Sequence, residues 1–434
     1  MISKNLTKEK KHEIVTEKYG SNFCAAPFNS LHEGPDGLVS TCCKTRVPIG
    51  NSKLQTFEEM YNSDHAKSVR RMFLLNEKPP QCNGCWELEK GTSKPANNRL
   101  FSNASGFNTI DEIVKNTQPD GTINIHKPEW LDLLWTNKCN FACLGCSPEL
   151  STTIAKNYKT SYSILNNIKY KDIPQDELQW KNDNKSKIDY ILRNKETINM
   201  IHLNGGEPFL SEDIFELLAV LLKNNLQKKI KIWSHTNGSV TTSYKGVDII
   251  NDYLVHWGNN AAITMSNDGN GARGEYIRYG YRDKKWLETY WKIKEAKIDL
   301  NIQTCINVFN GLAIEEISDW ILTNCSKTNI KPQGTLTIWT NPSTNIKLYN
   351  FDIEAKNKAI EILNRLEKTQ RHPEGWQRFL SKHKDWMQNI NDLNIQNVRN
   401  FLNGIVSLDK ERKTDFDKTF PELVEFKKRL ENII

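Results

Sequence analysis

The chain has 434 residues, of which 38% are apolar and 26% are charged, and its formal net charge is +7. This length is enough for two or three packed domains, and the 12 Trp and 16 Phe exclude a disordered chain. No run of about 18 apolar residues occurs, which excludes a membrane-spanning helix. The charged segment at residues 1–20 lacks the apolar core of a secretory signal, so we expect a cytoplasmic protein. Lys and Glu are mixed along the chain, which permits nucleic-acid binding without requiring it.

The N-terminal quarter of the chain predicts a helix or tail followed by a short hairpin and a second helix. Residues 1–20 form the tail, and the turn Pro35-Asp36-Gly37 predicts a hairpin over 31–41. Thr56 and Glu59 make a capping-box pattern that opens a helix running to about Leu75. Residues 91–125 are rich in Asn, Ser, Thr and Gly, which is typical of a linker.

From about residue 130, strand-like and helix-like patterns alternate. The expected strands are Leu131–Thr136, Met200–Gly205, Ile230–Thr236, Ala261–Asp268, Leu300–Val308 and Leu336–Asn341. Helical patterns between them include 211–222, Trp286–Lys297 and Ile314–Thr323. This succession predicts an α/β fold with a parallel sheet, in the form of a partial (β/α)6 TIM-like barrel with its site at the C-terminal ends of the strands.

The remaining segments complete the expected domain organisation. Residues 147–199 form a long insertion, interpreted either as a lid or substrate-facing surface or as a solvated excursion. The expected domains are a tail at 1–20, a cysteine-rich domain at 21–105, the partial barrel at 126–345 and a helical C-terminal region at 346–434.

Ten cysteines are the most informative feature of the composition. With no export signal expected, a disulfide framework is not expected either. Eight of them gather in two groups, one before residue 90 and one at 139–146, and such tight spacing indicates metal binding. Cys305 and Cys325 are interpreted as ordinary buried thiols, with hydrogen donation to a radical as a minor alternative for Cys305.

Cys139, Cys143 and Cys146 follow the first barrel strand with the spacing C-x3-C-x2-C. Three thiolates on one short loop can hold three irons of a [4Fe–4S] cubane and leave the fourth iron open for a small ligand. Zinc sites more often use four ligands and C-x2-C pairs. The position at the C-terminal end of a barrel strand strengthens the cluster interpretation.

This triplet resembles the signature of radical S-adenosylmethionine (SAM) enzymes. Three further segments match the family in order and at successive strand ends, namely Gly205-Gly206-Glu207-Pro208, Thr236-Asn237-Gly238 and Ser266-Asn267-Asp268-Gly269. The resemblance covers about 130–342. It departs from the family at Gly145, where an aromatic residue usually packs near the adenine, and Phe141 is a candidate substitute.

The resemblance implies a role for each matched residue. Gly205, Gly206 and Glu207, with Pro208, correspond to the segment that binds the methionine amino group, and Ser266 and Asp268 are placed to bind the ribose or the methionyl group. Arg278 is similar to an arginine that pairs with the methionine carboxylate, while Asn237 is a weaker candidate. For Ser266 and Asn237, plain turn chemistry is the alternative.

Cys24, Cys42, Cys82 and Cys85 make a second set, with Cys43 as an alternative to Cys42. With the predicted hairpin, Ile49-Gly50-Asn51 and the following helix, they resemble a SPASM/twitch-like auxiliary iron–sulfur domain. In most members of the family this domain follows the barrel, whereas here it precedes it. The resemblance implies a second [4Fe–4S] cluster that transfers electrons or supports the fold, and a four-cysteine zinc site is the alternative.

The family's mechanism is the reductive cleavage of SAM to methionine and a 5′-deoxyadenosyl radical, which abstracts hydrogen from a substrate. The resemblance implies a peptide or protein residue as the substrate and an electron donor such as flavodoxin or ferredoxin as a partner. A nucleoside, sugar or other small metabolite is the alternative substrate. A non-catalytic zinc or Fe–S scaffold is the alternative from another class, although such a scaffold has no need for an incompletely ligated cluster.

Overall fold

A computed structural model describes residues 6–45, 47–90, 95–125, 127–166, 184–242, 245–325, 336–340, 351–368 and 393–434. The chain forms two compact units. The first contains residues 1–135, 181–204 and 223–232, and the second contains 136–180, 205–222 and 233–434. The domain boundaries expected from the sequence stay a prediction.

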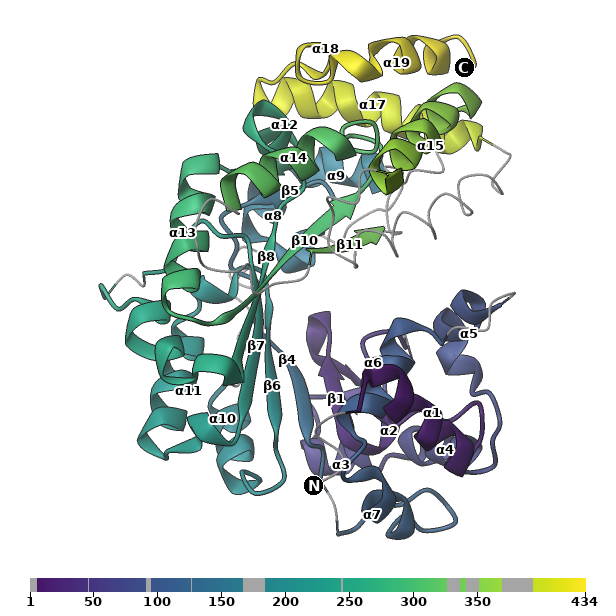
Figure 1. Cartoon of the computed structure of the whole chain (residues 1–434), viewed down its shortest axis with the longest axis vertical. Helices are drawn as coiled ribbons and strands as arrows, with labels where there is room; N and C mark the ends of the chain where they lie inside the picture. Colours follow the sequence, from purple (N-terminus) through teal and green to yellow (C-terminus); the bar gives the residue numbers. More distant parts are fainter. Residues whose placement is uncertain are drawn as a thin grey trace. The chain divides into compact units, whose positions relative to one another are not determined.

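Among the described residues, nine strands form one sheet in the order β11-β10-β8-β7-β6-β4-β1-β2-β3 (Figure 1). The strands are β1 Ser30–Glu33, β2 Leu38–Ser40, β3 Gly50–Asn51, β4 Trp130–Thr136, β6 Met200–Gly205, β7 Lys231–Thr236, β8 Ala261–Ser266, β10 Asp299–Ile306 and β11 Leu336–Thr340. Strand β10 pairs in parallel with β8 and β11, and β1 pairs in parallel with β4. The mostly parallel sheet confirms the predicted α/β class and is consistent with a partial TIM-like barrel.

The six strands predicted after residue 130 all form, with ends that differ from the prediction by one or two residues in most cases. The burial of their side chains explains why these strands form. In β4 the residues Leu131, Leu133, Leu134 and Trp135 are all buried, so the strand contributes apolar side chains to both faces, as strands of parallel sheets do. Asn341, at the end of the last predicted strand, lies outside the described residues.

The first unit builds the predicted hairpin from β1 and β2, joined by a short 3-10 helix at Pro35–Gly37. The capping box of Thr56 and Glu59 also forms. The single helix expected to follow it is two helices, α3 Phe57–Tyr61 and α4 Asp64–Leu74, because Ser63 caps a new helix.

The expectation of a linker at 91–125 is wrong for the described residues 95–125. They form α6 Asn97–Ser105 and α7 Ile110–Lys115, and α6 packs against α1 Lys8–Tyr19 (Figure 1). Leu100, Ile110 and Ile113 are buried, and these scattered apolar positions were hidden by the polar composition around them. The described part of the expected linker therefore contains two helices.

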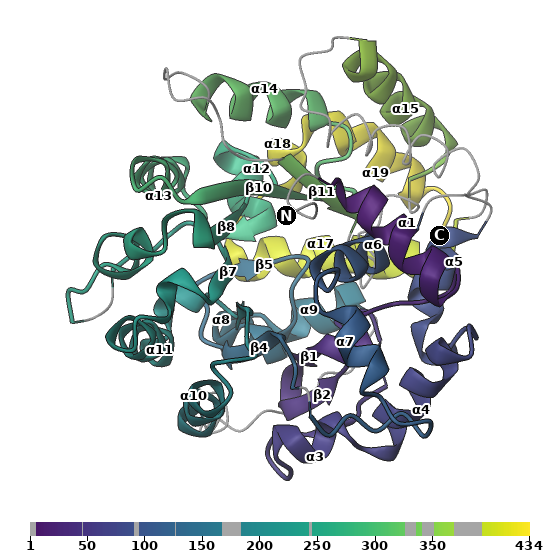
Figure 2. The ribbon, with the colours of Figure 1, turned by 60° about the horizontal axis from the view of Figure 1, so that its bottom comes forward.

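In the second unit, α13 Asp283–Glu295 packs against β10 and against α14 Ile314–Cys325 (Figure 2). These helices and α11 Glu212–Lys223 match the predicted amphipathic segments. The described part of the C-terminal region is helical, with α15 Ile353–Lys368, α17 Ile395–Arg412, α18 Phe416–Thr419 and α19 Val424–Glu431. Within the described residues, none of the helices has the length and apolarity needed to cross a bilayer.

The insertion at 147–199 contains α8 Thr152–Asn157, α9 Lys159–Asn166 and α10 Asn184–Arg193. Helix α9 packs along α17, so this part of the insertion is a packed element of the second unit (Figure 2). Residues 167–183 of the insertion lie outside the described residues. Its interpretation as a lid stays a prediction.

Candidate functional site

The cysteine triplet lies on the loop that leaves β4. Part of this loop forms a short strand, β5 Ala142–Cys143, which pairs antiparallel with β9 Arg278–Tyr279. In this register Cys143 is opposite Arg278. The loop is tightened further because the Cys146 amide donates to the Cys143 carbonyl over 3.1 Å. Two predicted site residues that are far apart in the sequence are thereby brought together.

The three thiols share one partly buried environment. Burial raises the pKa of Cys139, Cys143 and Cys146, the last to about 12. Repulsion from a Cys143 thiolate raises the pKa of Cys139 and Cys146 further. Without a bound cation these thiols are protonated at neutral pH. Soft thiolate sulfur is the ligand type that iron–sulfur clusters use, so a cationic cluster would displace the protons as it binds.

The glycines at the end of β6 lie directly against the cysteine loop. The Gly206 amide donates to the Thr136 carbonyl over 2.8 Å, and the Glu207 amide donates to the Lys138 carbonyl over 2.7 Å. A Cβ atom at Gly206 would stand 2.4 Å from the Lys138 carbonyl oxygen. Gly205 has φ +145°, which favours glycine, and a Cβ there would stand 2.3 Å from the Thr136 carbonyl oxygen. Glycine is therefore required at both positions for the backbone to reach the loop.

Glu207 is completely buried and its carboxylate joins two strand ends. It accepts hydrogen bonds from the Asn237 amide at 2.6 Å, the Thr236 hydroxyl at 2.8 Å and the Phe209 amide at 3.1 Å. Burial raises the pKa of Glu207 to about 7, although these three donors act in the opposite direction. The following Pro208 begins a buried 3-10 helix. The contacts of this carboxylate hold the end of β6 to the end of β7.

Asn237 lies beside the first cysteine of the triplet. Its side-chain nitrogen is 3.0 Å from Asn140 Oδ1 and 3.9 Å from the Cys139 sulfur. Its side-chain oxygen accepts from the Ser239 amide at 2.9 Å, as in an Asx turn. The contact with Ser239 agrees with the turn interpretation of Asn237, and the contact with Cys139 agrees with the site interpretation.

The segment after β8 is connected to the cysteine loop by an ion pair between Asp268 and Arg278. The Arg278 guanidinium is 2.8 Å from the Asp268 carboxylate, whose other oxygen accepts from the Cys305 amide at 2.6 Å. Burial lowers the pKa of Arg278, but Cys143 and Asp268 raise it by more, so the guanidinium is held charged. The Ser266 carbonyl accepts from the Trp286 indole over 2.9 Å. Asp268 and Arg278 thus form one unit next to Cys143.

Several polar atoms around the triplet have no hydrogen-bond partner among the described residues. They are the Arg278 Nε and both side-chain polar atoms of Asn137, all of them buried. Unsatisfied buried polar groups are costly, and in a functional site they are commonly completed by a ligand. The donor set around Cys139, Cys143 and Cys146 therefore fits a cluster that carries a ligand with carboxylate and amino groups. Phe141 is 1% exposed and its ring lies against Gly280, so its role toward an adenine stays a prediction.

The N-terminal cysteines form a second site in the first unit. Cys24, Cys42, Cys82 and Cys85 all line one cavity, together with apolar side chains such as Phe73 and Trp86. Cys43 does not line this cavity and is exposed. This placement favours Cys42 over Cys43 as the ligand. Within the described residues no three His, Cys, Asp or Glu side chains converge on a single metal ion, and this holds for both cysteine sets.

Burial again raises the pKa of these thiols, for Cys82 and Cys85 to about 12. A hydrogen bond with Cys42 lowers the pKa of Cys43 to about 6 and raises that of Cys42. Four cysteines around one apolar cavity fit a fully ligated four-iron cluster.

One polar cluster was missed by the sequence reasoning. Asp132, on β4, is 2.6 Å from His32 Nδ1 and 2.7 Å from His202 Nδ1. His32 and Asp132 line a small cavity that Cys42 and Cys43 also line. The one signal for this cluster was the lone Asp132 in an otherwise apolar strand.

Comparison with known proteins agrees with the N-terminal site. Residues 24–86 match the family model of the SPASM iron–sulfur cluster-binding domain. No curated protein sequence matches the chain. Among solved structures, anSMEcpe with bound AdoMet is 17% identical with TM-score 0.34, and the match covers 54% of this chain and 58% of that one.

Streptococcus suis SuiB bound to S-adenosylmethionine is 14% identical with TM-score 0.38, and the match covers 71% of this chain and 60% of that one. SuiB bound to its precursor peptide SuiA is 13% identical with TM-score 0.37, covering 73% and 63% of the two chains. The chain thus spans less than two thirds of the length of these solved proteins. The family match agrees with the SPASM part of the resemblance, and residues 24–86 are similar to the iron–sulfur cluster-binding domain of that family.

Proposed function

We propose that the chain is a radical SAM enzyme that cleaves SAM reductively and uses the 5′-deoxyadenosyl radical to take hydrogen from a substrate. The observation that carries this proposal is the pairing of Cys143 with Arg278 across β5 and β9. It joins a three-cysteine loop, which leaves a cluster iron open, to a partly buried cation that can bind a carboxylate. SAM has both a carboxylate and an amino group for these partners.

In this proposal the thiolates of Cys139, Cys143 and Cys146 hold the cluster, which when bound supplies the electron that cleaves the carbon–sulfur bond of SAM. Arg278 orients the methionine carboxylate through its unpaired Nε, and Asp268 holds the guanidinium in place. Gly205 and Gly206 let the backbone approach the ligand, while Glu207 fixes the loop and Ser266 and Asn237 are further candidates for SAM contact. Partial burial of the site limits the access of water to a reactive radical.

The auxiliary site takes a second [4Fe–4S] cluster on Cys24, Cys42, Cys82 and Cys85. We propose a peptide or protein residue as the substrate, because the resemblance to SPASM-containing enzymes implies that class. The electron donor is expected to be a flavodoxin or ferredoxin. The protein itself is expected to be cytoplasmic. A small metabolite is the alternative substrate class.

The first experiment counts iron, sulfide and zinc in anaerobically reconstituted protein and then tests for 5′-deoxyadenosine after addition of dithionite and SAM. We expect about eight irons per chain and SAM cleavage. Cys143→Ala should lower the count to about four and abolish cleavage, whereas Cys325→Ala, a buried thiol outside both sites, should change neither. SAM cleavage that survives in the Cys143→Ala protein would refute the assignment.

A second variant separates the two sites. Cys85→Ala should lose the auxiliary cluster but keep SAM cleavage. About four irons with one zinc in the unmodified protein would make the N-terminal site structural and leave the radical chemistry in place. No iron and no cleavage would leave the zinc scaffold as the surviving interpretation.

The substrate class is tested by fractionation of a cell extract by size. The peptide proposal predicts that the fraction containing peptides and proteins accelerates 5′-deoxyadenosine formation above the rate with SAM alone. Acceleration by the small-molecule fraction only would establish the metabolite alternative.

A further inference from the structure

Helix α6 lies outside the matched SPASM segment, yet its residues line the cavity of the auxiliary cysteines. Asn98 and Arg99 both border this cavity. The side chain of Arg99 is 5% exposed, although the segment was expected to be a linker. A long cationic side chain buried beside four thiols calls for a physical reason, because burying a charge is costly unless it is paired and hydrogen-bonded.

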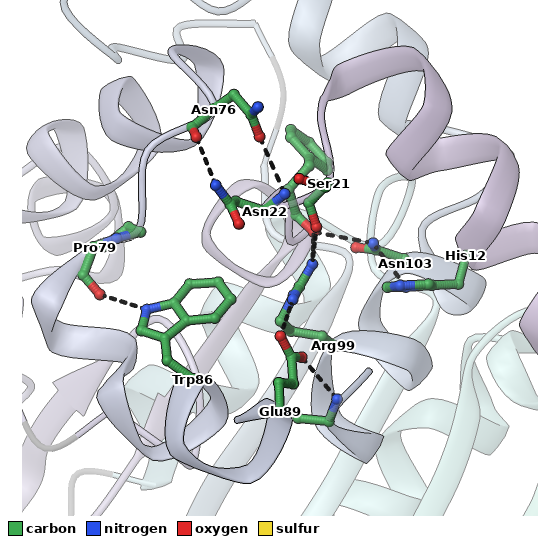
Figure 3. A network of polar contacts seen from close by, with 11 residues as sticks. His12, Ser21, Asn22, Asn76, Pro79, Trp86, Glu89, Arg99 and Asn103 are labelled. Carbon is green, nitrogen blue, oxygen red and sulfur yellow. Dashed lines mark hydrogen bonds and ion pairs between the residues drawn. The ribbon is translucent and has the colours of Figure 1, made fainter. Parts of the chain in front are cut away.

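Figure 3 shows how the Arg99 guanidinium is held. One terminal nitrogen donates to the Ser21 carbonyl at 2.6 Å and to the Phe23 carbonyl at 3.3 Å, and the other bonds the Glu89 carboxylate. The guanidinium carbon also lies 4.8 Å from the centre of the Trp86 ring. Two of these partners precede Cys24, and the other two belong to α5 Asn83–Glu89, which carries Cys85.

A second residue of α6, Asn103, forms hydrogen bonds with the segment around Cys24. Asn103 is completely buried, accepts from the Ala25 amide at 2.8 Å and donates to the Phe23 carbonyl at 3.1 Å. Cys24 lies between these two residues in the chain. Trp86 in turn donates to the Pro79 carbonyl at 2.9 Å, three residues before Cys82. Three of the four ligand segments are thus tied to each other through α5 and α6 (Figure 3).

We propose that Arg99 is a positioning residue of the auxiliary site, which fixes the Cys24 and Cys85 segments and, through its buried charge, stabilises the reduced cluster. This inference rests on the proposed cluster at Cys24, Cys42, Cys82 and Cys85. Reduction adds one negative charge to the cluster, and a nearby cation in a low-dielectric cavity lowers the energy of that state. Glu89, whose carboxylate pairs with the guanidinium, carries the opposite charge and opposes this effect.

The test uses the full chain in a Cys143→Ala background, so that only the auxiliary cluster gives a signal. The midpoint potential is measured by redox titration monitored by electron paramagnetic resonance, together with iron per chain. Arg99→Gln should lower the potential and the iron content, whereas Arg99→Lys should keep the potential near that of the parent protein. Lys78→Gln is the matched control, since this exposed lysine lies 5.6 Å from the same Trp86 ring and should leave both values unchanged.

Glu89→Gln provides a sign test that does not remove the arginine. Loss of the opposing charge should raise the potential. If Arg99→Gln assembles no cluster although its circular dichroism is native, the positioning role is supported and Glu89→Gln decides the charge effect. A parent-like potential and iron content in Arg99→Gln, or an unchanged or lowered potential in Glu89→Gln, would overturn the corresponding part of the proposal. Absence of iron in the Cys143→Ala parent itself would refute the cluster assignment, and the inference about Arg99 with it, whereas an iron-loaded parent with unaffected Arg99 variants would overturn the inference alone.

Discussion

Cys143 and Arg278 are direct partners across the two-stranded sheet of β5 and β9. The pairing is made by the backbone, so we expect the register to survive substitution of either side chain. The guanidinium of Arg278 can therefore be changed without moving the cysteine that it faces. This makes Arg278 a clean probe of ligand binding at the three-cysteine site.

We predict that Arg278→Gln weakens SAM binding to cluster-loaded protein by about 1.5–3 kcal/mol, the usual worth of a charge-assisted hydrogen bond. Arg278→Lys should lose less, because it keeps the charge but not the fork geometry. Arg282→Gln is the control, since that nearby side chain is 64% exposed. Equilibrium SAM binding under anaerobic conditions measures the effect, and wild-type affinity in Arg278→Gln would remove this residue from the site.

Gly206→Ala should impair assembly of the SAM-binding cluster. The added Cβ would stand 2.4 Å from the Lys138 carbonyl oxygen, so either the end of β6 or the cysteine loop must shift. We expect a destabilisation of about 1–3 kcal/mol, as for other overpacked sites. Iron content and urea unfolding measure it. Gly34→Ala is the control, because the nearest atom to its Cβ is at 3.6 Å, and equal losses in the two variants would contradict the argument.

The strands could be predicted because their apolar residues either run together, as in β4, or alternate with polar ones, as in β10. Met200–Gly205 was predicted with the ends that β6 has. The motif residues could be placed at strand ends for the same reason. The pairing of Cys143 with Arg278 could not, since two-residue strands leave no periodic pattern in a sequence.

Buried charged residues could not be predicted from the sequence either. Arg99 stands among Asn and Ser residues whose composition is typical of solvated loops, yet its charge is satisfied by Glu89 and by two carbonyls. Asp132 is likewise satisfied by two histidines from distant segments. Burial of a polar residue depends on partners that only the folded chain brings together.

Glu207 should make the stability of the apoprotein depend on pH. Its pKa is about 7 in the folded protein, above the ordinary value of 4.5, so the folded state binds its proton more tightly than the unfolded state does. The stabilising contribution is therefore full below about pH 4.5 and is lost as the pH rises through about 7. The relation between pKa and free energy sets its size at about 3 kcal/mol at most.

Unfolding by urea at a series of pH values tests this expectation. Glu207→Gln should remove the decrease between these pH values, whereas Glu216→Gln, an exposed carboxylate on α11, should retain it. A decrease of the same size in the Glu207→Gln protein would show that another group causes it.

Arg412, at the end of α17, should stabilise the cysteine loop from the C-terminal region. It is 5% exposed and donates to the Ala142 carbonyl at 2.7 Å and the Tyr276 carbonyl at 2.9 Å, residues that directly precede Cys143 and lie just before Arg278. Arg412→Met keeps the apolar stem but removes these two bonds and a third one to the Tyr162 hydroxyl at 2.9 Å. We therefore expect a loss of about 2–3 kcal/mol in unfolding free energy and faster release of iron from the SAM-binding cluster. Lys410→Met, an exposed cation on the same helix, should change neither value. Because the two carbonyls flank both partners of the β5–β9 pair, an Arg412→Met protein that is destabilised but holds its iron normally would show that the C-terminal helices support the fold and not the site.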